Sequence, residues 1–277
     1  MNLRKITSRA IVAGATTALA TGTLVGFTGT AATAVSNTTV YNCAMTSPFA
    51  TPIGTITMFV DTPVVPAQGT AGQSIGGGLL AFTSELTINS AAAGKLSAFG
   101  VDGGRTDDYA AHVGTTDIGA PMTFEAPVMN EDGTATMLGG GANTPFSLPG
   151  AGTYDVALPG EFNFVATSDG EDAAFINCVV AEPGSLGEIV LTKGASSMKG
   201  TSKRGKVNVT VDRPSDTVVP AGKVTAKLGK KTWTEKLDNK GKATFALPRS
   251  AKGKKVTVTY KGDKYTAAAS AIKVLVK

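Results

Sequence analysis

Residues 254–277, KKVTVTYKGDKYTAAASAIKVLVK, end the chain with the pattern of two β-strands joined by a turn. Val256, Val258 and Tyr260 alternate with threonines, which is the two-residue period of a strand that buries one face. Residues 261–264 interrupt this pattern with turn-forming Gly and Asp. The alternation then resumes over residues 272–276. We therefore expect this stretch to be the closing hairpin of an all-β domain.

The same alternation recurs upstream, over residues 207–211, 224–228 and 243–247, with turn signals at residues 229–230 and 239–241. About seven strands are expected in about 85 residues, which is the size of one immunoglobulin-like (Ig-like) domain. The composition agrees with short strands and many turns, because Gly is abundant and aromatic residues are few.

Residues 205–277 resemble bacterial Ig-like repeat domains, whose closing hairpin typically carries the motif Y-x-G-D-x-x-Y-x-x-S. Here the motif residues are Tyr260, Gly262, Asp263 and Tyr265, and Lys264 alone separates the aspartate from the second tyrosine. The resemblance implies a secreted, non-catalytic β-sandwich module.

Charge divides the chain into two blocks. Residues 36–186 hold two basic and fifteen acidic residues, whereas residues 187–277 hold twenty-one basic and six acidic residues, within an overall net charge of +5. Such a contrast indicates two domains. We expect an acidic β-sandwich domain over residues 38–192, a Ser/Lys/Gly-rich linker over residues 193–204, and the basic Ig-like domain over residues 205–277.

The N-terminus has the features of an export signal. Arg4, Lys5 and Arg9 precede an uncharged stretch over residues 11–27, and the small-x-small triplet at residues 32–34 is typical of a cleavage site. Residues 1–34 are therefore predicted to be a signal peptide, with a membrane anchor as the weaker alternative. No second long apolar run follows, so we expect a mature chain without an integral membrane segment, either secreted or held non-covalently at the cell envelope.

Cys43 and Cys178 are the two cysteines of the chain. In an exported protein a disulfide is the default interpretation. A metal site would need more ligands, and the chain has one histidine; we expect neither metal nor cofactor. The bridge would tie the first strand of the acidic block to its last.

Within the acidic block we expect strands and one short helix over residues 91–99, capped by Asn89-Ser90. The strands are expected over residues 41–44, 54–60, 79–88, 121–126, 133–138, 152–158, 161–167 and 174–181, and residues 61–78 are expected to be a loop. The YNC and INC triplets around the two cysteines, the Ala-rich helix and a stretch resembling G-x-F-x-L-P-G-A-G are similar to an uncharacterised domain of secreted actinobacterial proteins. This resemblance implies secretion and a disulfide, and no activity.

An enzymatic alternative rests on residues 72–76, GQSIG, which fit the G-x-S-x-G nucleophile pattern, with Asp102, Asp107 and His112 following in the order of a hydrolase triad. The pattern requires a strand, a sharp turn and a helix, but here it lies in a Gly-rich loop. A serine hydrolase using Ser74 and His112 is therefore the alternative and not the leading hypothesis. The acidic turns at residues 102–108 and 169–172 lack the spacing of a calcium loop and are typical of plain turns.

The lysines of the second block are the strongest functional signal, although exposed lysines also serve solubility and protect strand edges. We expect them to attract an acidic cell-wall polymer or another surface protein, including the acidic domain of a second copy. Nucleic acid is not expected, because aromatic residues are not interleaved for stacking. The leading hypothesis is a non-enzymatic surface protein with a binding, adhesive or structural role. The candidate contacts are Lys230, Lys231, Lys254, Lys255, Lys261 and Lys264.

Overall fold

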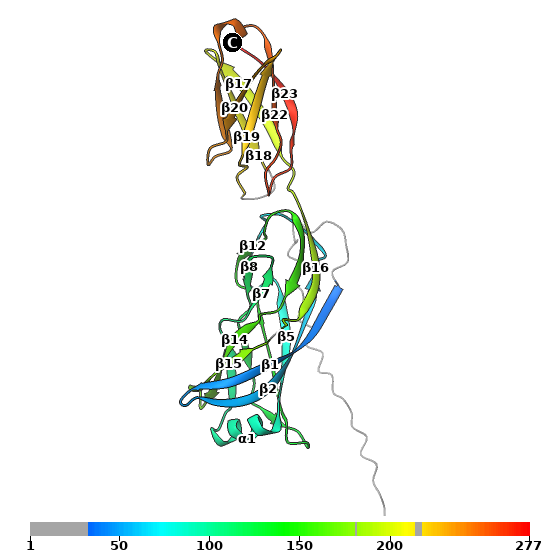
Figure 1. Ribbon diagram of the computed structural model, residues 1–277, viewed down its shortest axis with the longest axis vertical. Helices are drawn as coiled ribbons and strands as arrows, with labels where there is room; N and C mark the ends of the chain where they lie inside the picture. The colour runs from blue at the N-terminus through cyan, green and yellow to red at the C-terminus, as the bar shows by residue number, and fades with distance from the viewer. Residues whose placement is uncertain (1–32, 181, 214–217) are drawn as a thin grey trace, which may run out of the picture.

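The computed structural model describes residues 33–180, 182–213 and 218–277. They form two β domains placed end to end, and the C-terminus lies at the end of the second domain that points away from the first (Figure 1). Helix α1 (Ser90–Ala98) and the 3-10 turn η1 (Arg249–Ala251) are the helical elements of the described residues, which confirms the all-β class. No helix in these ranges is long and apolar enough to cross a membrane. The predicted export signal falls outside the described residues, apart from Thr33 and Ala34.

The first domain is built on a closed barrel of eight strands. The order is β11-β5-β2-β1-β15-β14-β6-β9, and β9 pairs back onto β11, while β10 extends β11 at its other end. The strands are β1 (Thr33–Ser47), β2 (Thr51–Val65), β5 (Ala81–Ile88), β6 (Gly103–Thr106), β9 (Met122–Phe124), β10 (Val128–Met129), β11 (Ala135–Ala142), β14 (Glu161–Ser168) and β15 (Glu171–Val179).

A run of glycines closes this barrel. Gly139, Gly140 and Gly141 of β11 pair with β9, and a Cβ added at Gly141 would lie 1.9 Å from the carbonyl oxygen of Pro121. The two backbones can approach this closely only because no side chain stands between them. The sandwich expected for this domain is therefore wrong, because its main sheet returns on itself.

A curved five-stranded sheet continues the barrel toward the second domain. Its order is β3-β16-β13-β7-β8, and it shares one hydrophobic core with the barrel. The expected loop over residues 61–78 thus contains short strands, and the strand that carries Cys178 is not the last of the domain, because β16 follows it. The strands are β3 (Gln68–Thr70), β7 (Ala110–Val113), β8 (Thr116–Gly119), β13 (Gly152–Ala157) and β16 (Ser185–Thr192), with a separate pair β4 (Ser74–Ile75) and β12 (Phe146–Ser147).

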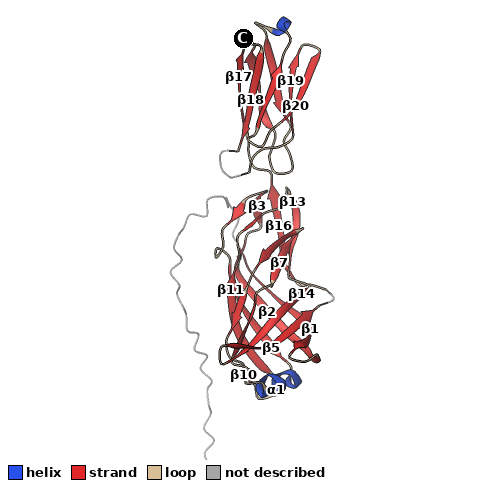
Figure 2. Ribbon diagram, turned by 90° about the vertical axis from the view of Figure 1, so that its left-hand side faces the viewer, coloured by secondary structure: helices blue, strands red, loops and turns tan. Residues whose placement is uncertain are grey.

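Helix α1 covers the end of the barrel opposite the second domain (Figure 2). The Asn89 side chain accepts a hydrogen bond from the Ala92 backbone at 3.0 Å and donates one to the Thr55 carbonyl at 2.7 Å. Leu96 is buried against the barrel core. The predicted helix and its cap are confirmed, because a side-chain cap and a small apolar face suffice to fix a helix of this length.

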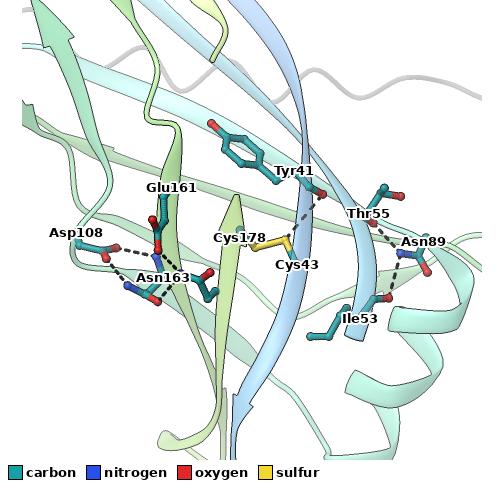
Figure 3. The surroundings of a disulfide bond; sticks show 10 residues. Tyr41, Cys43, Ile53, Thr55, Asn89, Asp108, Glu161, Asn163 and Cys178 are labelled. Atoms are coloured by element: carbon teal, nitrogen blue, oxygen red, sulfur yellow. Dashed lines mark hydrogen bonds between the residues drawn. A yellow bond between two sulfur atoms is a disulfide. The ribbon is translucent and has the colours of Figure 1, made fainter. Parts of the chain in front are cut away.

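The disulfide lies inside the barrel wall. Cys43 of β1 and Cys178 of β15 are direct cross-strand neighbours with Cα atoms 4.1 Å apart (Figure 3). The Tyr41 ring packs edge-on against Phe162 at 4.8 Å beside it. The predicted bridge is confirmed, but it joins adjacent strands and not the first strand to the last. Because such bonds persist in oxidising compartments, it indicates an extracytoplasmic location.

The second domain consists of a three-stranded sheet, β17-β18-β21, and a four-stranded sheet, β20-β19-β22-β23. Both contribute to one core, in which Val209 and Phe245 of the first sheet meet Val258 and Tyr260 of the second. β17 occupies much of the stretch expected to be a linker, because its apolar residue Met198 belongs to this core. The strands are β17 (Ser197–Lys203), β18 (Lys206–Asp212), β19 (Lys223–Leu228), β20 (Lys231–Lys236), β21 (Lys242–Ala246), β22 (Lys255–Tyr260) and β23 (Ala269–Leu275).

Candidate functional site

Direct contacts join the two domains at one end of the second. Arg213, 2% exposed, donates hydrogen bonds to the Ala71 carbonyl at 3.1 Å and to the Tyr265 carbonyl at 2.8 Å. The Ala151 backbone N–H donates to the Lys264 carbonyl at 2.9 Å. Because hydrogen bonds from a charged donor stabilise more than neutral ones, the two bonds of Arg213 help to hold the domains together.

The closing-motif residues lie at this junction. Gly262 has φ +85°, and an added Cβ would lie 2.4 Å from the Thr266 carbonyl oxygen, so a glycine is required. The Asp263 carboxylate accepts hydrogen bonds from the backbone N–H groups of Ala221, Tyr265 and Thr266, each at 2.7 Å. The Tyr260 hydroxyl, 3.1 Å from the carboxylate, is a further donor. The aspartate therefore organises the turn despite its one-residue shortening.

These hydrogen bonds predict a pH dependence. Burial acts to raise the pKa of Asp263, but the backbone donors outweigh it and hold this pKa below its usual value. A lowered folded-state pKa contributes stability above the unfolded pKa of about 3.9, and this stability is lost as the pH falls through the folded pKa. We expect Asp263→Asn to lower the free energy of unfolding of the second domain at pH 7 by about 2 kcal/mol.

Urea titrations at several pH values, followed by fluorescence of Trp233, would measure this effect, since Trp233 is the one tryptophan and packs on the core of the second domain. The difference in the free energy of unfolding between the wild type and Asp263→Asn should become smaller below pH 4. Asp238→Asn is the comparison variant: backbone hydrogen bonds also hold the pKa of Asp238 below its usual value, but this carboxylate is exposed, so its substitution should change the free energy of unfolding less at every pH. If this difference in free energy stays constant down to acid pH, the ionised Asp263 carboxylate does not stabilise the turn.

A cluster of cations occupies the opposite end of the second domain, which we call the basic tip (top of Figures 1 and 2). Backbone hydrogen bonds hold the segments of the tip side by side. The Gly205 N–H donates to the Lys277 carbonyl at 2.8 Å, and the Val276 N–H donates to the Lys254 carbonyl at 3.0 Å. The β19–β20 turn belongs to the same end, because β19 runs antiparallel to β22. The basic tip consists of ten exposed cations: Lys203, Arg204, Lys206, Lys230, Lys231, Arg249, Lys252, Lys254, Lys255 and Lys277.

The basic tip contains no acidic residue within the described ranges. The described carboxylates of the second domain, Asp212, Glu235, Asp238 and Asp263, all lie toward the junction. None of the tip cations has a described carboxylate within salt-bridge distance. The described side chains of the tip therefore form a concentrated positive charge.

The structure separates the six lysines predicted to bind an acidic polymer. Lys230, Lys231, Lys254 and Lys255 lie on the basic tip, but Lys261 and Lys264 lie at the junction, where the Lys264 ammonium is 4.5 Å from the centre of the Tyr265 ring. The grouping of lysines at the basic tip had a signal in the sequence, namely the order of the turns. Every second turn between antiparallel strands lies at the same end of the domain, so basic residues in those turns lie near one another.

The far end of the first domain carries the opposite charge. We define the acidic end as the exposed Asp102, Glu131, Asp132, Asp169, Glu171 and Asp172, which surround α1 and the β14–β15 turn. Contacts tie these segments together: Asp169 donates its backbone N–H to Asp102 at 2.7 Å, and a Cβ at Gly133 would touch Ser90 of α1. The acidic end and the basic tip lie at opposite ends of the long axis (Figure 1).

Several acidic turn residues have structural partners. Arg105 forms a two-point ion pair with Asp172 at 2.5 and 2.9 Å and contacts Asp107 at 3.0 Å, which holds the pKa of Asp172 below its usual value. Asp108 accepts hydrogen bonds from the backbone and side chain of Asn163 (Figure 3). In the described ranges, no group of three or more histidine, cysteine or acidic side chains could hold a metal ion.

The residues of the hydrolase alternative have other partners. Ser74 lies in the two-residue strand β4, followed by a turn, and its hydroxyl is 3.1 Å from that of Ser147. His112 of β7 contacts Asp117 of β8 at 2.8 Å. The described structure contains no hydrogen bond between Ser74 and His112, and no helix directly follows the serine. The strand–turn–helix context of a nucleophilic serine is therefore missing.

Comparisons with known proteins assign no family. No protein-family model matches the sequence, and no curated protein matches it. A solved structure of a Corynebacterium diphtheriae protein described as membrane-anchored is similar with a TM-score of 0.40 and 11% identity over 87% of this chain. The Bacillus anthracis TIE protein follows with a TM-score of 0.18 and 12% identity over 90% of this chain. The chain spans 59% and 50% of these two proteins.

Proposed function

We propose that this protein is a non-enzymatic, extracytoplasmic binding protein whose basic tip holds it on a phosphate- or carboxylate-bearing polymer of the cell envelope. One observation carries the proposal: the tip gathers ten exposed cations and no described acidic residue. Such a concentration of like charge attracts anions and raises their local concentration.

The strand register supports this proposal. Lys203 and Lys206 are direct cross-strand partners at the β17–β18 turn. Leu228 of β19 pairs with Lys231, which places Lys230 and Lys231 at one turn. Directly opposed like charges destabilise a sheet unless an anion lies between them. A polyanion that spans several of these turns would relieve the repulsion at each.

We also propose that the second domain is an Ig-like module that presents the tip at a distance from the first domain. Its seven strands in two sheets around one core support this assignment, together with the closing motif at residues 260–265. The module would place the basic tip at the end of the second domain that points away from the first (Figure 1).

A pelleting assay with insoluble wall material tests the tip. We expect the combined substitution of Lys230, Lys231, Lys254 and Lys255 by Gln to reduce binding at low salt by about tenfold or more, because the attraction sums over all four charges. Binding of the wild type should fall steeply as salt is added, since exposed charges are screened. Removal of the acidic polymers from the wall should also abolish it.

The matched control variant also replaces four lysines by Gln, but in the half of the second domain near the junction: Lys223, Lys236, Lys240 and Lys242. This variant has the same net charge as the tip variant and should retain most of the binding. Equal losses in both variants would show a nonspecific charge effect, and salt-independent binding would contradict the electrostatic proposal.

A second candidate function is self-assembly, favoured because the exposed residues of the acidic end and of the basic tip lie on elements at opposite ends of the molecule (Figure 1). The basic tip of one copy would contact the acidic end of the next, and such a head-to-tail contact propagates into a filament. Sedimentation velocity should then show concentration-dependent growth that high salt and the tip variant both abolish. A monomer at all concentrations and salt levels would exclude it.

A further inference from the structure

An apolar cavity of about 100 Å³ lies in the first domain, between barrel strands β2 and β5 and the curved sheet of β7, β8, β13 and β16. Protein interiors contain few voids larger than a water molecule. Apolar side chains dominate the lining, including Ile75, Val113, Ile118, Leu158 and Ile189. An apolar cavity of this kind favours apolar molecules over water.

Two polar side chains of the lining are directed to protein partners. The Asn143 side chain is fully used, because it donates to the carbonyls of Gly76 and Thr144 and accepts from the Leu80 backbone. Tyr109 is 2% exposed, and its buried hydroxyl interacts with that of Tyr41. The neighbouring Tyr41 hydroxyl donates its own proton to the Pro159 carbonyl at 2.9 Å.

Tyr109 adds no charge to the lining. Burial, together with the neighbouring Tyr41 hydroxyl, raises the pKa of Tyr109 well above its usual value, so the hydroxyl keeps its proton. No lysine, arginine or histidine lines the cavity, so an ionised carboxylate would find no counter-charge there.

Some of the lining side chains are partly exposed to solvent. Val65, Leu80, Phe82 and Phe146 line the cavity but are partly exposed, and Leu79, next to Leu80, is 58% exposed. An apolar chain longer than the cavity could continue along these side chains. We propose that the cavity binds the alkyl chain of an uncharged lipid of medium chain length.

Methyl NMR of the intact two-domain chain tests this with 1-decanol as the probe. Isoleucine methyl signals of Ile75, Ile118 and Ile189 should shift in a saturable manner, whereas Ile272, in the core of the second domain, should not. Ala111→Leu, at a half-buried lining position, should fill the cavity and abolish the shifts.

Each alternative outcome is decisive. Unchanged isoleucine signals in the wild type, or equal shifts at Ile272, would overturn the site. Tighter binding of decanoate than of 1-decanol at pH 8 would overturn the uncharged ligand. The tip variant with four glutamines should bind 1-decanol normally, so this test is independent of the proposed polymer binding.

Discussion

Removal of the Cys43–Cys178 disulfide should lower the free energy of unfolding of the first domain by about 4 kcal/mol, because the bond closes a long loop in the unfolded chain. The two cysteines are 135 positions apart, and the folded barrel already holds them opposite each other on β1 and β15. The bond therefore acts mainly by restricting the unfolded state. For a domain of this size the loss corresponds to a fall in Tm of about 10 °C.

The variant Cys43→Ala/Cys178→Ala and the reduced wild type should both show this loss. Near-ultraviolet circular dichroism of the buried Tyr41 and Tyr109 follows the first domain, whereas Trp233 fluorescence follows the second. Reductant should change the wild type but leave the alanine variant unaffected, which separates the bond from other effects of reduction. A loss below about 1 kcal/mol would contradict the long-loop argument.

Substitution Gly141→Ala should destabilise the first domain by about 3 kcal/mol, because it opens the seam at which the barrel closes. The added Cβ would lie 1.9 Å from the Pro121 carbonyl oxygen and 3.1 Å from the Phe82 ring. The carbonyl belongs to the backbone next to β9, so it cannot rotate away as a side chain could. Urea unfolding followed by near-ultraviolet circular dichroism would measure the loss.

Gly94→Ala is the matched control for this prediction. Gly94 lies within α1, and no atom outside the helix backbone lies within 4 Å of the position of an added Cβ. Alanine should stabilise the helix by about 0.5–1 kcal/mol, since it loses less backbone entropy than glycine on folding. Glycine-to-alanine substitution should thus lower the free energy of unfolding at position 141 and raise it at position 94. If Gly141→Ala leaves the free energy of unfolding unchanged, β9 and β11 do not approach as closely as described.

Local pattern alone predicted several elements correctly. The alternation of Val256, Val258 and Tyr260 corresponds to the buried face of β22, and Asn89 caps α1 as its position before an alanine-rich stretch predicts. The cysteine pairing followed from export and from the presence of two cysteines. These features depend on neighbouring residues or on composition, so no knowledge of long-range contacts was needed.

The closed barrel was not predictable from the same reasoning. Strand alternation shows that one face is buried, but it is the same for a barrel and for a sandwich. Closure depends on whether β9 pairs with β11, and the glycines that permit it look like ordinary turn or loop residues in the sequence. The linker prediction failed for a related reason: β17 is polar apart from Met198, and its strand character comes from pairing with β18.

The sequence by itself determined the β class, the two charge blocks and the disulfide partners, because these follow from composition and short-range period. Only the tertiary structure decided which charges act together. Lys203, Lys230 and Lys254 are distant in sequence, and they share the basic tip because successive antiparallel strands return their turns to the same end. Lys261 lies only six residues beyond Lys255, but one strand length carries it to the opposite end of the domain.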